Sequence, residues 1–331
     1  MTEHSTTPER KMEDIRVVMV FGQDTTLGQT LVPYLESKGI KVVPRSTDHD
    51  LPADISSAIK KDIQLKRPDV VVNCLLDPDP SQLPHDWLGR HLIPTHAILQ
   101  ECRDSGIRLI QCSSAKLFGP FIEPLTGYSE YDPALCVGED PWRPIIHAME
   151  NMVWQQTSVY NAAAVAGTSP EFECYMLRIG ELLTKRNLQR PTGLSNKVSL
   201  CDSLKRIVKG EPVVFRPEQH QYTVSPIRDV TVCKYIAAMV ERHCPIPTGT
   251  YHLGSSSSAS LAEIYTYVSS RTATRSPITV PSEANRLDPL VGVDGYQGMD
   301  TSLLNERFTA MKLPRWKQEV GRLLNNSLVA F

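Results

Sequence analysis

The sequence lacks the features that mark membrane, nucleic-acid-binding and secreted proteins. A membrane-spanning helix needs an apolar run of about 18 residues, and the 331-residue sequence contains no run of that length. It has no basic excess, because the formal net charge is −2 and the pI is about 6.5, which argues against nucleic acid and anionic membranes as partners. The N-terminus contains no apolar core of the signal-peptide type, so we expect a cytoplasmic protein.

The cysteines and histidines lack the spacings of metal and redox sites. The eight cysteines include no C-x-x-C pair, and Cys74 and Cys112 fall inside apolar runs, so we expect reduced thiols. The nine histidines include no H-E-x-x-H motif and no Cys/His cluster of zinc spacing. A Walker loop and a serine-centred nucleophile elbow are also missing, and this disfavours P-loop NTPase and α/β-hydrolase chemistry.

The first half of the chain alternates between strand and helix patterns, which predicts a doubly wound parallel sheet. Apolar runs typical of strands buried on both faces are separated by segments of helical spacing. The predicted strands cover residues 15–22, 40–45, 68–76, 107–114 and 172–183. The predicted helices cover 26–39, 87–106 and 144–160, and Gly39 is expected to end the first of them.

Composition and pattern divide the chain into three parts. Residues 1–13 are polar and are expected to form a disordered tail, and residues 14–184 form the sheet domain. Residues 185–331 form a smaller lobe, from which about 222–254 return to the sheet domain. A long loop over 119–143 is expected to be functional or partly mobile.

Two helix starts are predicted in the second half. Asp229 is the expected N-cap of the helix that follows it, and Ser260 with Glu263 forms a capping box.

The stretch VVMVFGQDTTLGQTL resembles a strand that enters a phosphate-binding loop. Gly22 stands where such a loop turns tightly, and Gly28 where its helix packs close to the strand. The middle position, which usually lacks a side chain beside the phosphates, is Thr25, and Asp24 adds a negative charge. These residues agree with two alternatives. The loop still binds a dinucleotide, or it is kept only because the fold needs it.

Several segments in order resemble the extended short-chain dehydrogenase/reductase family, in particular its dTDP-4-dehydrorhamnose reductases and the regulatory beta subunits of methionine adenosyltransferase. They are GQDTTLG, RPDVVVNC, ILQECRDSGIRLIQCSSAKLFG, YMLRIGELL and IRDVTVCKYIAAMVE. The resemblance implies a Rossmann-type α/β fold with a smaller C-terminal substrate-like lobe. It also implies an NADP(H) site to which Gly22, Thr25, Leu27, Gly28, Arg45, Asp54, Leu75 and Ser113 contribute.

Two of these positions have alternative roles. In the family an arginine at the end of the second strand pairs with the 2′-phosphate of NADP(H). The alternative for Arg45 is a solvated arginine at a strand end that binds no ligand. Asp50 and Asp54 resemble an acidic turn beside the adenine, and they are equally helix caps.

The family reaction needs a tyrosine as proton donor, a lysine four residues later, and a Ser or Thr after the fourth strand. Ser114, rather than Ser113, matches the Ser/Thr position. Ile145 and Met149 align with the tyrosine and lysine, and neither carries a titratable proton. His91 occupies the position of a supporting asparagine.

Other residues near the site differ from the family pattern as well. Leu75 and Leu76 replace the alanine pair beside the ribose. His147, Tyr128 and Tyr131 are the residues that can replace the lost acid.

Three functions agree with these residues. The first is a non-catalytic regulatory subunit, and the missing tyrosine and lysine favour the loss of catalysis. Its expected partner, the catalytic subunit of methionine adenosyltransferase, follows from the resemblance alone, and the regulatory beta subunits generally keep the tyrosine and lysine. The second is an NADPH-dependent reductase of a nucleotide-sugar 4-ketone with a relocated acid. The third is a structural accessory subunit of a larger complex, in which Thr25, Leu75 and Leu76 fill the cofactor groove.

Overall fold

The computed structural model describes most of both halves of the chain. The described residues are 17–46, 54–76, 88–119, 127–133, 142–167, 171–189, 197–211, 213–214, 222–241, 246–272, 278–279, 290–291 and 297–328. The predicted tail over 1–13 and Asp50 lie outside these residues, as do 120–126 and 134–141 of the predicted loop.

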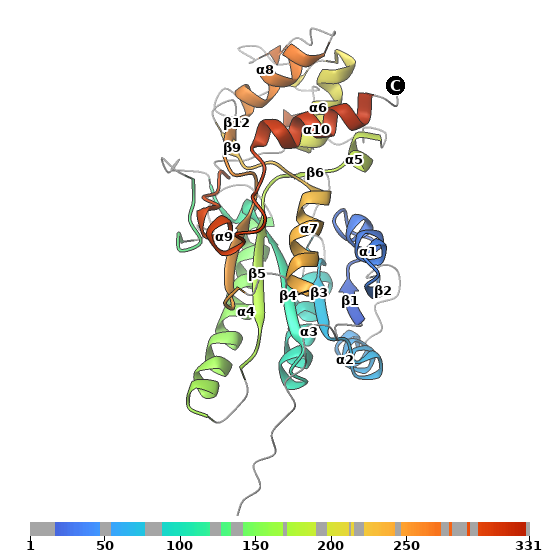
Figure 1. Ribbon diagram of the computed structural model, residues 1–331, viewed down its shortest axis with the longest axis vertical. Helices are drawn as coiled ribbons and strands as arrows, with labels where there is room; N and C mark the ends of the chain where they lie inside the picture. The colour runs from blue at the N-terminus through green and yellow to red at the C-terminus, as the bar shows by residue number, and fades with distance from the viewer. Residues whose placement is uncertain are drawn as a thin grey trace, which may run out of the picture.

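The predicted doubly wound parallel sheet is confirmed (Figure 1). Its strand order is β11-β5-β4-β3-β1-β2, and every neighbouring pair is parallel. The strands are β1 (Val17–Phe21), β2 (Lys41–Arg45), β3 (Val70–Asn73), β4 (Arg108–Ser114), β5 (Cys174–Ile179) and β11 (Gly249–Leu253). The central strands β3, β4 and β5 are almost entirely buried, as expected for apolar runs covered on both faces.

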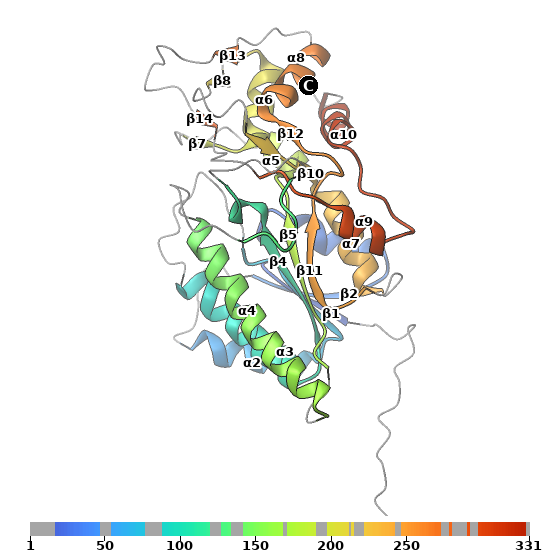
Figure 2. The same ribbon diagram turned by 90° about the vertical axis from the view of Figure 1, so that its left-hand side faces the viewer.

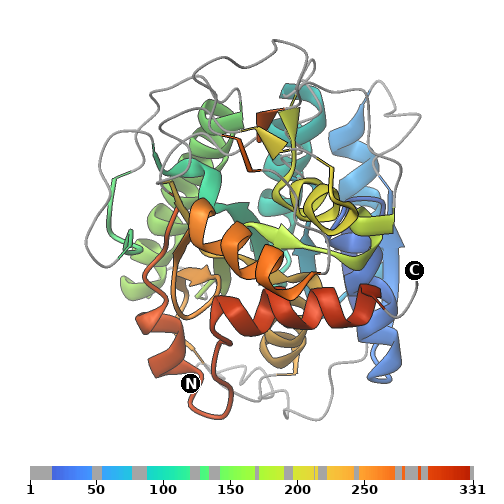
Figure 3. The same cartoon turned by 90° about the horizontal axis from the view of Figure 1, so that it is seen from above.

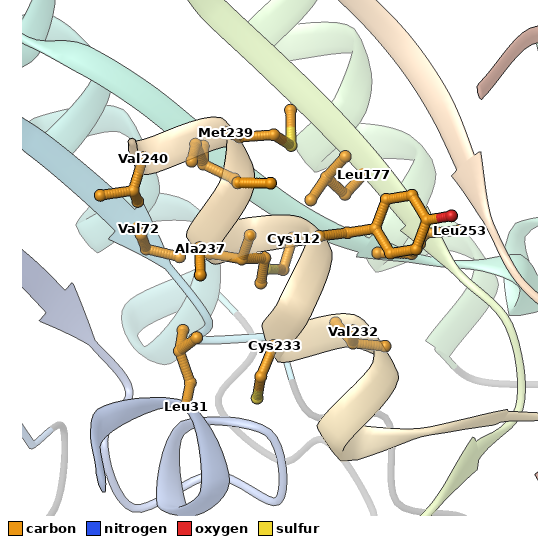
Figure 4. Packing of buried hydrophobic residues seen from close by; sticks show 14 of the residues in the cluster. Leu31, Val72, Cys112, Leu177, Val232, Cys233, Ala237, Met239, Val240 and Leu253 are labelled. Carbon is orange, nitrogen blue, oxygen red and sulfur yellow. The ribbon is translucent and has the colours of Figure 1, made fainter. Parts of the chain in front are cut away.

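Helices cover both faces of the sheet (Figure 2). One face carries α1 (Gly28–Ser37) and α7 (Asp229–Val240), and Figure 4 shows α7 directing Val232, Ala237 and Met239 into this core. The other face carries α2 (Ile55–Lys66), α3 (Ile93–Asp104), which follows the π-helical turn η2 (Leu88–Leu92), and α4 (Trp142–Val165). Helices α1, α3 and α7 agree with predicted segments, whereas α2 was not among the predicted helices, and α4 begins earlier and extends further than the predicted 144–160.

The strand predicted over 172–183 is interrupted. β5 ends at Ile179, and the short strand β6 (Leu182–Leu183) leaves the sheet to pair with β10 (Ile227–Arg228). The break falls at Gly180, where an added Cβ would lie 2.0 Å from the carbonyl oxygen of Ser225. Only a glycine permits the two backbones to approach so closely.

A second hydrophobic core lies in the C-terminal lobe. Its helices are α5 (Lys185–Gln189), α6 (Leu200–Lys209), α8 (Leu261–Arg271) and α10 (Trp316–Leu328), and α9 (Ser302–Arg307) packs beside β11. Two-residue strands complete the lobe: β7 (Lys197–Val198), β8 (Val213–Val214), β9 (Thr223–Val224), β12 (Ala259–Ser260), β13 (Ile278–Thr279) and β14 (Leu290–Val291). Seen from above, α10 lies across this lobe beside α8 (Figure 3).

Two predicted helix ends are confirmed. Ser260 and Glu263 form the full capping box at α8. Gly39 follows α1 with a φ of +79°, and its N–H donates to the carbonyl of Glu36, as a glycine after a helix end does.

The predicted N-cap at Asp229 is wrong. Asp229 is the first residue of α7, and its carboxylate accepts bonds from the N–H of Val230 and the hydroxyl of Thr30 on α1. The start of α7 is capped instead by the fully buried carboxylate of Glu319 on α10, which accepts from the N–H of Arg228 at 2.6 Å and the hydroxyl of Thr231 at 3.0 Å. A cap supplied from a distant helix leaves no local sequence pattern.

Candidate functional site

The candidate site lies where the strand order reverses. From β1 the chain passes to β2 on one side, and β3 lies on the other, so the segments after β1 and β3 meet at this switch point. Gly22 has a φ of +80°, and an added Cβ would lie 2.7 Å from the carbonyl oxygen of Cys74. At Gly28 an added Cβ would lie 1.9 Å from the carbonyl oxygen of Gly22. Both glycines are therefore required by the close approach of strand and helix.

The side chain of Thr25 closes the turn that leads into helix α1, whose first residue is Gly28. Its hydroxyl donates to the carbonyl of Gly22 at 2.7 Å and accepts from the N–H of Gly28 at 3.1 Å, while its own carbonyl accepts from the N–H of Gln29. A hydroxyl that accepts from the third following N–H is the geometry of an N-cap. The side chain at the middle position of the loop thus takes up a donor at the helix start.

The first backbone N–H groups of the loop are also hydrogen-bonded within the protein. The N–H groups of Gly22 and Gln23 donate to the carbonyl of Arg45 at 2.9 and 3.1 Å. Beside them, the side-chain amide of Gln29 donates to the carbonyl of Asp24 and accepts from the guanidinium of Arg186 on α5. Arg186 brings a cation from the C-terminal lobe to the start of α1, and no motif in the sequence indicated this contact.

Replacing Thr25 with alanine is expected to lower the free energy of unfolding by about 1 kcal/mol, because the N–H of Gly28 loses its acceptor. Thr25→Ser keeps the hydroxyl and is expected to retain nearly all of the stability. Urea denaturation of both variants measures the difference. Equal stability of the alanine variant and the native chain would contradict a capping role.

The two residues expected near the adenosine end have partners within the protein. The guanidinium of Arg45 makes two contacts with the carboxylate of Asp62 on α2, at 2.9 and 3.2 Å. Asp54 caps α2 by accepting from the N–H of Ser57, and hydrogen bonds from the hydroxyl and N–H of Ser57 lower the pKa of Asp54. The helix-cap alternative for Asp54 is therefore present in the structure.

The bulky residues near the groove pack into the cores. Leu27 belongs to the core under α1 and α7, and Leu75 to the core under α2, α3 and α4. Leu76 is half-buried against Leu117 and Ile145. The hydroxyl of Thr25 is turned to the backbone of its own loop, and the side chain of Leu75 packs in the core.

Ser113 and Ser114 at the end of β4 have different surroundings. Ser113 is buried, and its hydroxyl donates to the Glu150 carboxylate of α4 at 2.5 Å. Ser114 is half-buried, and its hydroxyl accepts from the N–H of Lys116. Ser114 is thus the more accessible of the two, in agreement with its match to the family Ser/Thr position.

Sequence reasoning missed a buried ion pair next to these serines. The guanidinium of Arg178 on β5 binds the carboxylate of Glu150 through Nε and Nη2, at 3.0 and 2.8 Å, and both side chains are less than a tenth exposed. Its Nη1 donates to the carbonyl of Glu130. The available signal was an arginine in a buried strand, since a charge there needs a partner.

His252 and Glu130 extend this network. The N–H of His252 donates to the carboxylate of Glu130 at 3.0 Å, and Nδ1 of His252 lies 3.0 Å from the carbonyl oxygen of Asp300. Burial, reinforced by the Arg178 cation, lowers the pKa of His252 to about 3. Burial also raises the pKa of Glu130. His252 is therefore neutral in the folded protein at neutral pH.

The low pKa of His252 predicts a loss of stability in acid. In the unfolded chain His252 takes up a proton near pH 6.5, whereas in the folded protein it does so only near pH 3. The contribution of neutral His252 to the free energy of unfolding is therefore complete above pH 6.5, and it declines as the pH falls toward 3. Glu130 has a raised pKa and acts in the opposite sense, losing its contribution as pH rises. We expect His252→Gln to flatten the fall in unfolding free energy between about pH 7 and 5, and Glu130→Gln to steepen it. Denaturant titrations across this range measure both slopes, and unchanged slopes would contradict the prediction.

The positions aligned with the family tyrosine and lysine are apolar and buried. Ile145 packs with Trp142, Ile146 and Leu117 beside the turn η3 (Ala115–Leu117) that follows β4. Met149 lies in the core, where its sulfur is 3.4 Å from the side-chain nitrogen of Gln111. The buried Arg143 is the one titratable residue among Trp142–Ile146, and its guanidinium donates to the carbonyls of Lys116 and Phe118.

The supporting and replacement residues lie in separate places. His91 contacts the Trp142 ring edge-on at 5.3 Å. His147 bonds to Asn151 one turn further along α4, and Tyr131 is 87% exposed. Tyr128 alone among the three candidate acids packs beside the end of β4, because its ring stacks on Phe118 at 4.4 Å in a cluster with Ala115.

Within the described residues, no group of three or more His, Cys, Asp or Glu side chains is arranged to hold a metal ion. No helix among them is long and apolar enough to span a membrane. The six cysteines that the structure describes are free thiols and are buried.

Comparison with solved structures shows the fold of the whole chain. The chain is similar to dTDP-4-dehydrorhamnose reductase from Bacillus anthracis in complex with NADP (17% identity, 94% of this chain and 98% of that one, TM-score 0.65). It is also similar to UDP-glucose 4-epimerase from Thermus thermophilus in complex with NAD (17% identity, 95% and 99% coverage, TM-score 0.66). A third is dTDP-glucose 4,6-dehydratase from Bacillus anthracis in complex with NAD (11% identity, 95% and 97% coverage, TM-score 0.71).

No curated protein matches the sequence. A family model does match the part of the chain that builds the phosphate-loop domain, from β1 to just beyond α4. That model is the one for the NAD dependent epimerase/dehydratase family, and it matches residues 18–168 of this chain.

Proposed function

We propose that this chain is a regulatory member of the extended short-chain dehydrogenase group that binds a nucleotide and does not transfer hydride. The observation that carries the proposal is the apolar start of α4, where Trp142, Ile145 and Ile146 pack against the turn after β4. A general acid contributes roughly 10²–10⁴-fold in rate, and this segment supplies none.

The expected ligand is a dinucleotide, with NADP(H) as the first candidate. Supporting this, the loop keeps both glycines at its points of close approach, and α1 begins at the switch point, where its N-terminal dipole favours phosphate. Such a cofactor supplies hydride chemistry when it is bound. In this chain Gly22, Gly28 and the capped start of α1 would hold its pyrophosphate. The Arg45–Asp62 pair must open if Arg45 is to hold a 2′-phosphate.

The proposed partner is the catalytic subunit of methionine adenosyltransferase. Support for it comes from the resemblance of the ordered sequence segments to the regulatory beta subunits. In this role the chain would modulate the synthesis of S-adenosylmethionine through a protein contact.

The test separates binding, turnover and partnership. Isothermal titration of the full chain with NADPH and NADH is expected to give saturable binding. The absorbance of NADPH is expected to stay constant when dTDP-4-dehydrorhamnose is added. Size-exclusion chromatography with a purified methionine adenosyltransferase catalytic subunit is expected to give a joint peak. NADPH oxidation at the rate of a reductase would overturn the non-catalytic proposal, and separate peaks would overturn the partner.

A second candidate, an NADPH-dependent nucleotide-sugar reductase, is favoured by the position of Tyr128. This ring lies in a cluster with Ala115, the residue after Ser114, and the solved relatives include a reductase, an epimerase and a dehydratase. Its hydroxyl would donate the proton that the family tyrosine donates. If turnover occurs, Tyr128→Phe is expected to abolish it while keeping the stacked ring, and Tyr131→Phe serves as the exposed control. Full turnover of Tyr128→Phe would exclude Tyr128 as the acid.

A further inference from the structure

A cavity lies between α7, α10 and the segment that joins α9 to α10, away from the phosphate loop. Its volume is about 400 Å³, which suits a ligand of mononucleotide size. Figures 1 and 2 show the joining segment rising beside α7 before α10 begins. The cavity therefore spans the sheet domain and the C-terminal lobe.

The walls of this cavity are fixed by hydrogen bonds. The N–H of Leu313 donates to the side chain of Asn305 at 3.0 Å, and the carbonyl of Pro314 accepts from the N–H of Ser256 at 2.9 Å. On the α7 side, the ring of Tyr235 packs against Phe308 at 5.2 Å. Met311, Leu313 and Tyr235 give the cavity an apolar side against which a ring can lie.

The charged residues that line the cavity are all cations. They are Lys234 on α7, Lys312 on the joining segment and Arg322 on α10, in a chain whose formal net charge is −2. The nearest carboxylate on α10, Glu319, is fully buried and accepts from the N–H of Arg228 and the hydroxyl of Thr231. It lies 3.8 Å from the Arg322 guanidinium, and the described residues that line the cavity include no carboxylate beside Lys234 and Lys312.

We propose that this cavity binds a small organic phosphate. The three cations that line the cavity from three segments supply the attraction for a multiply charged phosphate, and the apolar wall receives the organic group. The Lys312 ammonium already donates to the carbonyl of Asn305 at 2.9 Å, and this holds one cation at the rim. The proposal is independent of the dinucleotide site, because no residue of the phosphate loop lines the cavity.

The test is isothermal titration of the full chain with ADP and, separately, with inorganic pyrophosphate. The Lys234→Glu/Lys312→Glu double variant is expected to weaken ADP binding by about tenfold or more, because it reverses two charges at the opening. Lys317→Glu is the matched control, since its ammonium lies over the Trp316 ring outside the cavity. ADP is expected to bind more tightly than pyrophosphate, because only ADP uses the apolar wall.

A second variant separates this cavity from the phosphate loop. Thr25→Asp keeps a capping side chain but adds a negative charge at the loop, so it is expected to leave ADP binding in the cavity unchanged. Circular dichroism verifies that all variants are folded. The proposal is overturned if ADP does not bind, if the double lysine variant binds as the native chain does, or if Thr25→Asp alone removes the binding.

Discussion

Replacing Arg178 with methionine is expected to lower the free energy of unfolding by about 3–5 kcal/mol. The substitution leaves the Glu150 carboxylate buried without its cation, and the hydroxyl of Ser113 cannot neutralise that charge. It also removes the bond from Arg178 to the carbonyl of Glu130, which fastens residues 127–133 to the sheet. Urea denaturation followed by circular dichroism measures the loss.

Two further variants test the cause of this loss. The double variant Arg178→Met/Glu150→Leu removes both charges and is expected to recover a large part of the stability, because a buried ion pair can be replaced by apolar groups at little cost. Arg45→Met breaks a pair whose side chains are 29% and 39% exposed, and it is expected to cost less than about 1 kcal/mol. If the double variant is no more stable than Arg178→Met, an uncompensated charge is not the cause.

Gly22→Ala is expected to destabilise the chain by about 2–4 kcal/mol, from the sum of backbone strain and a steric clash. Gly39→Ala provides a control with the same backbone, since φ is +80° at Gly22 and +79° at Gly39. An added Cβ at Gly39 meets nothing within 4 Å, whereas at Gly22 it meets the carbonyl of Cys74 at 2.7 Å. We expect Gly39→Ala to cost only about 1 kcal/mol. The difference between the two denaturation midpoints isolates the clash, and equal midpoints would contradict it.

The parts of the fold that could be predicted are those with local causes. The apolar runs that became β1, β3 and β4 are buried on both faces, and this makes their pattern continuous. The box of Ser260 and Glu263 is complete within four residues. By contrast, the cap of α7 comes from Glu319 and the strand break comes from the Ser225 carbonyl against Gly180. Both depend on residues distant in sequence, so no local pattern contains them.

The candidate site was predictable to a similar extent. The positions of Gly22 and Gly28 follow from the spacing of one short loop. The role of Thr25 could not be predicted, because it depends on the conformation of the loop that places its hydroxyl between the Gly22 carbonyl and the Gly28 N–H. The network of Arg178, Glu150 and His252 joins two strands and a helix, and only the order of the sheet brings these residues together.

The cap that Glu319 supplies to α7 makes the order of folding matter. Arg228 and Glu319 are 91 residues apart. During synthesis all residues of α7 are therefore in the chain before most of the C-terminal lobe, including Glu319, has been made. Until α10 docks, the N–H of Arg228 lacks the Glu319 acceptor and depends on water, and closing so long a loop is slow. We therefore expect α7 to be completed together with the docking of α10. The sheet domain therefore acquires its full stability only when the last helix is in place.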